Sequence, residues 1–382
     1  MGERGSSKLK LLDKYVGIPL IFLLGLLRKR NRSRMENPER IVIVMIAAIG
    51  DTILLSSVIK ELRREYPHAN ISLICSKGNL LAAKNNPDVD NIIDVDMGKI
   101  SQSLFMLRKL PKADWLLDFG PWARFNALLS FVIKAEIKIG FKRTKMFRHY
   151  IYDRFVEHSD ELHELENYRS LLKIIPCRLY HEHPVFKIKE ESKKVVKDLL
   201  QPNSQYIVFH MFASGSHKEK KEWPMRLWEE LAQQLMSRGY NIILTGGKED
   251  IERAEAVVQR LRPLQEHDCL SVAGRLSLEE TAAVISESIL MITVNTGIMH
   301  LAAAIDTSII ALHGPTSPKR WGPVSNKAVV LTPRVQCDKL LSLGFEEHHC
   351  SIQDGCISTI RVEDVVYHVE KGESFAISGG VF

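Results

Sequence analysis

The feature that most restricts the fold is a strand–turn–helix–strand pattern within residues 289–312. One apolar run ends at Asn295-Thr296-Gly297, and a segment of helical periodicity separates that turn from a second apolar run. Two apolar strands connected through a helix lie parallel in one sheet. The pattern therefore predicts an α/β fold that contains at least one βαβ unit.

The turn at Gly297 also has the properties of an anion-binding site. Glycine lets the backbone approach a ligand closely, and the following helix presents unpaired N–H groups and a partial positive charge. Phosphate is a common anion at such helix starts, and His300, one turn into the helix, can face the same ligand. The alternative is that the turn only begins a helix and that His300 packs against it.

The same stretch closely resembles the nucleotide-binding signature of glycosyltransferase family 9, the ADP-heptose:lipopolysaccharide heptosyltransferases. The matching residues are Asn295-Thr296-Gly297, His300-Leu301-Ala302-Ala303 and Gly314-Pro315-Thr316-Ser317-Pro318-Lys319-Arg320-Trp321. The resemblance extends over roughly residues 40–330. One difference is Asn295, which stands where well-known members have aspartate; asparagine keeps the capping ability and removes the charge.

The resemblance implies the GT-B architecture, in which two Rossmann-like domains face a central cleft. The sequence agrees, because a buried strand at residues 41–45 and a turn at residues 47–51 open one α/β pattern, and Tyr206 begins a second. A stretch rich in turn residues at 201–204 suggests the connection. We predict a terminal segment at residues 1–35, an acceptor domain at 36–195 and a nucleotide-sugar-binding domain at 196–382.

The net charge of +6 is confined to one end of the chain. Residues 1–40 hold ten Lys or Arg and four Asp or Glu, so the remaining chain has 42 of each and is neutral. A general nucleic-acid binder carries its basic patch on the folded domain. The charge distribution therefore argues against nucleic acid as a partner.

The basic terminal segment contains an uncharged run of 12 residues, Val16–Leu27. A membrane-spanning helix needs about 20 apolar residues, so this run is too short to cross a bilayer. Arg28-Lys29-Arg30 follows it, where a signal peptide has a cleavage site of small residues. We predict that the segment lies on an anionic membrane surface. The alternative is a helix that packs in the core or forms oligomers.

For the reaction, the resemblance assigns Asp51 as the catalytic base of an inverting transfer and Lys221 as a ligand of the donor phosphates. Asp51 follows Gly50 at the first strand–helix turn, at the carboxyl edge of the first sheet and facing the cleft. Lys221 matches the family's Lys-x-Trp-Pro motif, and the loop before it offers Ser214 and Ser216. The alternatives are a helix cap for Asp51 and a surface position for Lys221.

The nucleotide contacts are expected at two further turns. Glu249 and Asp250 follow Gly246-Gly247 and could bind ribose hydroxyls, and the resemblance places Leu276 against adenine. Helix capping is the alternative at both turns. With Asn295, Thr296, Gly297 and His300, these residues complete the predicted donor site.

No metal cofactor is expected. Two D-x-D patterns, at residues 88–90 and 94–96, flank an apolar strand and are expected to cap and solvate it. Cys75, Cys177 and Cys269 resemble ordinary thiols of a reduced compartment. Three further cysteines could ligate zinc with His348 and His349, although their spacing matches no paired C-x-x-C motif; they are Cys337, Cys350 and Cys356.

Residues 138–154 interleave six Lys or Arg with four Phe or Tyr. This composition fits either a groove for a phosphorylated or sugar-rich acceptor or a solvated basic loop.

The resemblance thus implies a peripheral enzyme of the cytoplasmic face of the bacterial inner membrane. It would transfer heptose or a related sugar from an ADP-sugar to a glycolipid acceptor, the lipopolysaccharide core. Two alternatives are a relative that uses another nucleotide sugar for a different surface glycan, and a tethered glycolipid-binding protein that has lost catalysis.

Overall fold

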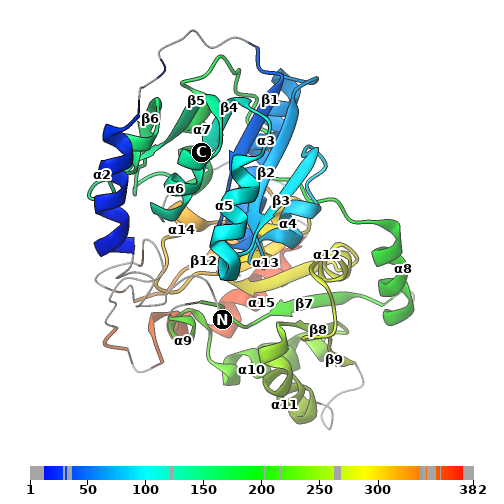
Figure 1. The fold of residues 1–382 in the computed structure, drawn as a ribbon. Coiled ribbons are helices and arrows are strands. Elements are labelled where there is room, and N and C mark those ends of the chain that lie inside the picture. Colours follow the sequence, from blue (N-terminus) through cyan, green and yellow to red (C-terminus); the bar gives the residue numbers. More distant parts are fainter. Residues whose placement is uncertain are drawn as a thin grey trace. The chain divides into compact units, whose positions relative to one another are not determined.

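Twelve parallel strands form two sheets in the described part of this chain, whose structure is a computed structural model (Figure 1). The structure describes residues 13–28, 31, 37–120, 124–201, 204–215, 217–261, 268–335, 337, 341, 350–352 and 354–372. The chain divides into two compact units, Met1–Val185 and Phe186–Phe382. The predicted boundary between residues 195 and 196 falls inside helix α8 (Glu190–Leu199), ten residues after the division between the two compact units.

The sheet of the first unit has the order β3-β2-β1-β4-β5-β6. Its strands are β1 (Arg40–Val44), β2 (Asn70–Ser76), β3 (Asn91–Val95), β4 (Ala113–Asp118), β5 (Ala135–Lys142) and β6 (Arg154–Glu157). In the central strand, Ile41 pairs with Ile71 on one side and Trp115 on the other, and all three side chains are buried. Near-continuous apolar runs are expected in parallel strands that are covered on both faces.

Two helices of the first unit precede β1, and the others follow the strands in alternation. They are η1 (Asp13–Gly17), α2 (Ile18–Leu26), α3 (Ile49–Glu65), α4 (Leu80–Lys84), η2 (Met97–Lys99), α5 (Ile100–Arg108), α6 (Arg124–Val132), η3 (Arg148–Ile151) and α7 (Glu164–Leu172). Helix α3 buries Leu55, Ile59 and Leu62, the three residues that its periodicity places on one side.

The sheet of the second unit has the order β12-β11-β10-β7-β8-β9. Its strands are β7 (Tyr206–His210), β8 (Asn241–Thr245), β9 (Cys269–Ser271), β10 (Leu290–Val294), β11 (Ile309–Leu312) and β12 (Ala328–Leu331). Besides α8, its helices are α9 (Lys218–Lys221), α10 (Met225–Met236), η4 (Lys248–Asp250), α11 (Ile251–Leu261), α12 (Leu278–Ser286), α13 (Gly297–Ala304), α14 (Pro318–Trp321), η6 (Cys356–Thr359) and α15 (Val362–Glu370). The βαβ unit predicted within residues 289–312 is confirmed as β10, α13 and β11.

Both sheets have the same topology when each is read from its first strand. In each unit, the second and third strands lie on one side of the first strand, and the fourth, fifth and sixth lie on the other side. This is the doubly wound arrangement in which ligands bind beyond the carboxyl ends of the strands, where the order reverses. The reversal lies between β1 and β4 in one unit and between β7 and β10 in the other, and the predicted α/β class is confirmed.

Helix α2 packs on the first unit through one face. Ile21 is fully buried beside Ala127, Ile151 and Tyr152, and Gly25 lies so close to Tyr150 that a Cβ there would come within 2.9 Å of the Tyr150 Cβ. Figure 1 shows this helix beside α6. The core-packed alternative is therefore correct for this face. Among the described residues, none of the helices combines the length and apolar character needed to cross a membrane.

Candidate active site

The carboxyl edge of the second sheet brings together the loops that carry the predicted donor-site residues. Ser214 and Lys221 lie after β7, and Glu249 and Asp250 lie after β8. The loop after β9 holds Leu276, and the start of α13 follows β10. Strands β7, β8 and β10 are parallel neighbours, so their loops emerge at one edge and flank the reversal of strand order.

Helix α13 begins as the sequence predicts. Thr296 is its N-cap residue, with φ −142° and ψ 171°, and Gly297 is the first helical residue. The Thr296 side chain makes no capping hydrogen bond, and among the described residues its buried Oγ1 has no hydrogen-bond partner. The first N–H groups of the helix are thus left for an anion rather than for a side-chain cap. His300 is 4% exposed on this helix.

Asn295 connects two loops of this edge. Its Nδ2 donates a hydrogen bond to Thr316 Oγ1 over 2.7 Å, which ties the end of β10 to the loop after β11. An amide can donate this bond to a hydroxyl oxygen and a carboxylate cannot. The asparagine that departs from the family pattern therefore has a structural function in this chain.

Lys221 is the last residue of the short helix α9. Its ammonium donates to the Ser214 carbonyl over 2.8 Å, which folds the loop after β7 back on itself. The Glu222 carboxylate accepts from the Ala213 N–H over 3.0 Å and pairs with Arg253 at 2.5 Å, so both ends of the loop are fixed. Ser214 is exposed, and Ser216 lies outside the described residues.

In the loop after β8, Asp250 caps the backbone, which is the alternative to a ribose contact for this residue. Asp250 Oδ2 accepts from the Gly247 N–H over 2.8 Å, and burial raises the pKa of Asp250 above its ordinary value. Gly246 is required there, since a Cβ would lie 2.9 Å from the Asp250 Cβ. Glu249 is exposed, and its contact with a ribose stays a prediction.

Leu276 is half-buried in the turn before α12. The capping box that follows it is present, because Ser277 Oγ accepts from the Glu280 N–H at 3.2 Å and Glu280 accepts from the Ser277 N–H at 2.7 Å. The cap fixes the turn and leaves Leu276 outside the helix, which is compatible with an apolar contact to a base.

His210 is a residue of this edge that sequence reasoning missed. It ends β7 between β8 and β10, is 8% exposed, and its Nδ1 lies 2.9 Å from Thr245 Oγ1. The Thr245 hydroxyl donates to the Phe209 carbonyl, so the histidine is assigned as the donor to Thr245. Burial lowers the pKa of His210 to about 4, which keeps the ring neutral at neutral pH. A polar residue ending an apolar strand was the available signal.

In the first unit, Asp51 lies within the first turn of α3, because the helix begins at Ile49 rather than after Asp51. Its Oδ2 accepts from the Ala48 N–H over 3.2 Å, which is the capping alternative, and the residue is 5% exposed. The position follows β1, next to the reversal of strand order between β1 and β4. Capping and acceptance of a proton use the same carboxylate and do not exclude each other.

A buried cluster around Asp118, at the end of β4, is the second group that sequence reasoning missed. The Asp118 carboxylate accepts from Tyr152 at 2.5 Å, and from Arg148 and Ser130 at 3.0 Å each. Burial alone would lower the pKa of Arg148, but Tyr152 and Asp118 raise it overall. The cluster fixes the carboxyl end of β4, the other strand at the reversal.

Four of the six cations in residues 138–154, the stretch predicted as an acceptor groove, have partners within the first unit. Lys138 is buried and donates to the Phe131 carbonyl over 2.8 Å, and Arg148 belongs to the buried cluster. Lys142 and Arg143 pair with carboxylates at 2.6 and 2.9 Å. These contacts hold β5, η3 and β6 together, so the loop alternative is wrong where β5 and η3 form, and the acceptor groove stays a prediction.

The D-x-D carboxylates cap backbone groups, as expected. Asp90 accepts from the Ile71 N–H at 2.7 Å, and Asp96 accepts from the Gly98 N–H at 2.8 Å.

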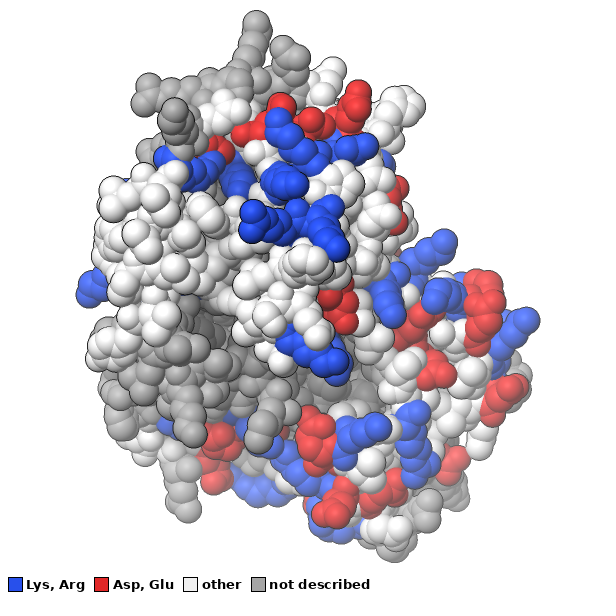
Figure 2. Space-filling view, viewed as in Figure 1, with Lys and Arg blue, Asp and Glu red and all other residues white. Residues whose placement is uncertain are grey.

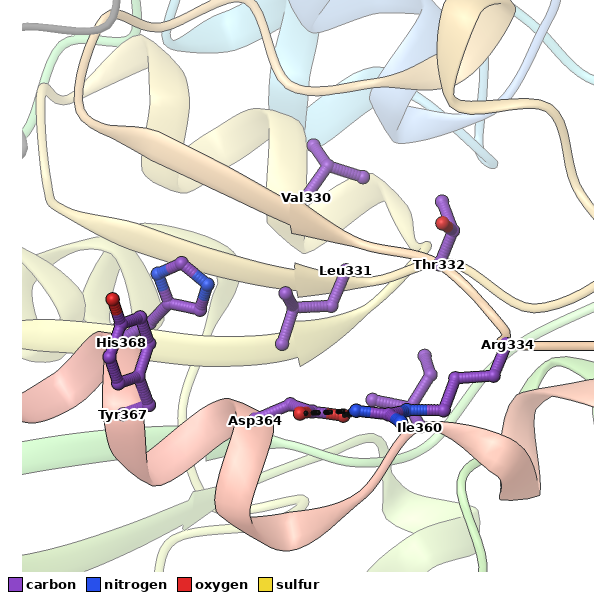
Figure 3. A pocket seen from close by; sticks show the side chains of 8 residues that line it. All are labelled: Val330, Leu331, Thr332, Arg334, Ile360, Asp364, Tyr367 and His368. Carbon is purple, nitrogen blue, oxygen red and sulfur yellow. Dashed lines mark hydrogen bonds and ion pairs between the residues drawn. The ribbon is translucent and has the colours of Figure 1, made fainter.

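A pocket of about 470 Å³ lies between β12 and α15, and none of the predicted donor residues lines it (Figure 3). Among its lining residues the cation is Arg334, which is paired with Asp364 at 2.9 Å. Because this guanidinium is already neutralised, the pocket offers little to a diphosphate, and we do not assign the donor site to it.

The comparisons with known proteins agree with this geometry. The family profile described as Glycosyltransferase family 9 (heptosyltransferase) matches residues 124–347. Lipopolysaccharide heptosyltransferase 2 of Salmonella typhimurium is 24% identical over 309 residues, 76% of this chain and 87% of that protein. Lipooligosaccharide heptosyltransferase 2 of Haemophilus influenzae is 26% identical over 76% of this chain and 88% of its own.

Solved structures share the fold. The glycosyl transferase family 9 protein from Veillonella parvula has a TM-score of 0.73 and 22% identity, over 89% of this chain and 98% of that one. The E. coli ADP-heptose lps heptosyltransferase II has a TM-score of 0.69 and 21% identity, over 87% and 98%. The profile match covers more than half of the chain, and the motif and sheet topology agree with it. The chain is therefore a member of glycosyltransferase family 9, the heptosyltransferase family.

Proposed function

We propose that this protein transfers heptose, or a related sugar, from an ADP-sugar to a lipopolysaccharide core acceptor with inversion at the anomeric carbon. The observation that carries the proposal is the open start of α13 beside the loop that holds Lys221, both at the reversal of strand order. E. coli heptosyltransferase WaaC, solved with ADP and with ADP-2-deoxy-2-fluoro heptose, has TM-scores of 0.68 and 0.66 to this chain.

In the proposed reaction, Asp51 accepts the proton of the acceptor hydroxyl. The hydroxyl oxygen forms a bond to the anomeric carbon as the bond from that carbon to the diphosphate oxygen breaks. ADP departs with the electron pair, and the N–H groups of α13 and the ammonium of Lys221 stabilise its charge. These groups take the role that a divalent cation has in D-x-D enzymes, so catalysis needs no added metal.

We also propose that α2 holds the protein at the cytoplasmic face of the bacterial inner membrane. While Ile21 faces the protein, apolar side chains of the same helical region remain exposed on its other side, and Figure 2 shows a largely uncharged surface over α2. They are Tyr15, Val16, Leu23, Leu26 and Leu27. An exposed apolar helix face close to basic residues suits an anionic lipid surface.

The experiment that tests the enzymatic proposal measures ADP release from ADP-heptose with and without a lipopolysaccharide core acceptor. We expect release that requires the acceptor and does not require added Mg²⁺. Acceptor binding without ADP release would favour the non-catalytic alternative, and release from another nucleotide sugar alone would favour the relative that builds a different glycan.

A further inference from the structure

Three cysteine side chains meet in the second unit. The sulfur atoms of Cys337, Cys350 and Cys356 all lie within 4.8 Å of one another, and those of Cys337 and Cys350 are 3.5 Å apart. All three are thiols rather than members of disulfides, with Cys356 1% exposed and the other two half-buried. Thiols from three points of the stretch 337–356 thus share one small volume.

The spacing of these sulfur atoms is that of a thiolate metal site. A tetrahedral zinc ion with Zn–S bonds of about 2.3 Å places its sulfur ligands roughly 3.8 Å apart. The observed separations bracket that value, so an ion at the centre requires only small movements of the side chains. A disulfide needs the two sulfur atoms about 2.05 Å apart and would leave the third thiol without a partner.

The cluster lies in a connection that a metal cross-link would stabilise. The cysteines lie between β12 and α15, where the described residues contain one isolated strand bridge, Thr316 with Leu341, and the short helix η6. A metal that closes a long connection stabilises the fold, because binding free energy then contributes to folding.

We propose that Cys337, Cys350 and Cys356 bind a structural metal ion, with Zn²⁺ as the preferred ion. Soft thiolate ligands select zinc among the abundant divalent ions, and three of them leave one tetrahedral position for a further ligand. On binding, each thiol loses its proton to solvent as its metal–sulfur bond forms, so three protons are released and the Zn(S)₃ unit carries one negative charge. No electron transfer is involved.

The cluster contacts the loops of the donor site without belonging to that site. Cys356 begins η6, which packs against α9, the helix that ends at Lys221. The next residue, Ile357, lies against Gly314, where an added Cβ would be 3.0 Å from the Ile357 Cβ. Leu341 donates to the Pro315 carbonyl over 2.6 Å and pairs with Thr316, the partner of Asn295. By holding Cys337, Cys350 and Cys356 together, the ion would therefore support the loop that carries Lys221 and the loop that follows β11.

The first measurement is the zinc and iron content of full-length protein purified without chelator and reconstituted with Zn²⁺. We expect about one zinc per chain, lost in Cys356→Ser and retained in Cys177→Ser. Cys177 is a matched control, since it is also a thiol that burial makes less acidic but it lies in the first unit.

A second measurement covers the case in which Cys356→Ser does not fold. Wild-type protein reconstituted with Co²⁺ should show thiolate-to-cobalt charge-transfer absorption and the intense visible bands of a tetrahedral site. Titration of the thiols with a mercurial should release zinc in step with the cysteines modified and should lower the melting temperature.

Folded wild-type protein that stays metal-free after reconstitution, or that contains a Cys337–Cys350 disulfide and no metal, would overturn the proposal. The metal content does not depend on the proposed function, and only the effect on the donor loops rests on it. One zinc per chain in a protein that does not bind ADP would leave the metal site standing and remove the proposed donor site.

Discussion

Asn295 Nδ2 donates a 2.7 Å hydrogen bond to Thr316 Oγ1 and so joins the turn that begins α13 to the loop that follows β11. The two residues belong to separate parts of the family signature, and β10 and β11 are paired neighbours. The contact fixes the position of the α13 start relative to the next loop. It also links the predicted donor site to the chain between Cys337 and Cys350, because Thr316 pairs with Leu341.

The hydrogen bond of Asn295 predicts different results for two substitutions. Asn295→Ala leaves the Thr316 hydroxyl, in a residue 5% exposed, without this partner and should lower the free energy of unfolding by about 1–3 kcal/mol. Asn295→Asp should lower the free energy of unfolding by less, because the Thr316 hydroxyl can rotate and donate a hydrogen bond to the carboxylate. Denaturant unfolding of the three proteins measures this order. Equal stability of the alanine variant and the wild type would show that the bond contributes nothing.

Lys221 and His300 are expected to contribute to ADP affinity. A charge-assisted hydrogen bond contributes roughly 1.5–3 kcal/mol, so Lys221→Ala should weaken ADP binding by about 10- to 100-fold, and His300→Ala should also weaken it. Lys218→Ala is the matched control, since Lys218 begins the same short helix and is exposed. Calorimetric titration with ADP gives the affinities. If neither predicted variant differs from the Lys218 control, the nucleotide site is elsewhere.

His210 predicts a specific dependence of stability on pH. Burial lowers its folded-state pKa from 6.5 to about 4. Between these values the unfolded chain binds the additional proton, so stability is lost as the pH falls through this window. The free energy of unfolding of the wild type should fall by roughly 2 kcal/mol more between pH 7 and pH 5 than that of His210→Gln. Parallel pH curves for the two proteins would contradict a buried neutral ring.

The exposed face of α2 is expected to bind lipid. Leu23 and Leu26 are 55% and 84% exposed, so their joint replacement by glutamine should reduce binding to anionic vesicles with little change in melting temperature. Leu81→Gln is the control, since Leu81 is 48% exposed on α4. Vesicle co-sedimentation provides the comparison. Undiminished sedimentation of the double variant would exclude this face as the membrane contact.

The sequence predicted local structure well where one short pattern determines it. The apolar run before Asn295-Thr296-Gly297 and the periodicity after it are sufficient to define β10 and α13. The predicted turn at residues 47–51 puts the start of α3 too late. In the structure Asp51 accepts a hydrogen bond from the Ala48 N–H and so stabilises a helix that begins at Ile49.

Long-range partners could not be predicted in the same way. Residues 138–154 have the composition of a basic surface. In the structure, Arg148 and Tyr152 are buried and donate hydrogen bonds to Asp118, which is distant in the sequence. The apolar run that contains α2 has no polar positions that would distinguish its faces, so only the structure shows that Ile21 faces inward and Leu26 outward. The proximity of the Cys337, Cys350 and Cys356 sulfur atoms is likewise a tertiary contact that their spacing in the sequence does not determine.

Asp51→Asn separates capping from base catalysis. The amide oxygen of asparagine can still accept from the Ala48 N–H, so folding and ADP binding should stay close to those of the wild type. Turnover should fall by at least about 10²–10⁴-fold, since an amide cannot take the acceptor proton. Near-normal turnover would make Asp51 a cap, and a simultaneous loss of melting temperature and ADP binding would make it structural.

The most direct test of the central claim is the mass of a lipopolysaccharide core acceptor after incubation with ADP-heptose and the purified wild-type protein. The account predicts that the acceptor gains one heptosyl residue, that ADP forms in equal amount, and that Asp51→Asn yields little product in the same time. An acceptor of unchanged mass, with a protein that is folded and saturated with ADP-heptose, would contradict heptosyl transfer to this acceptor.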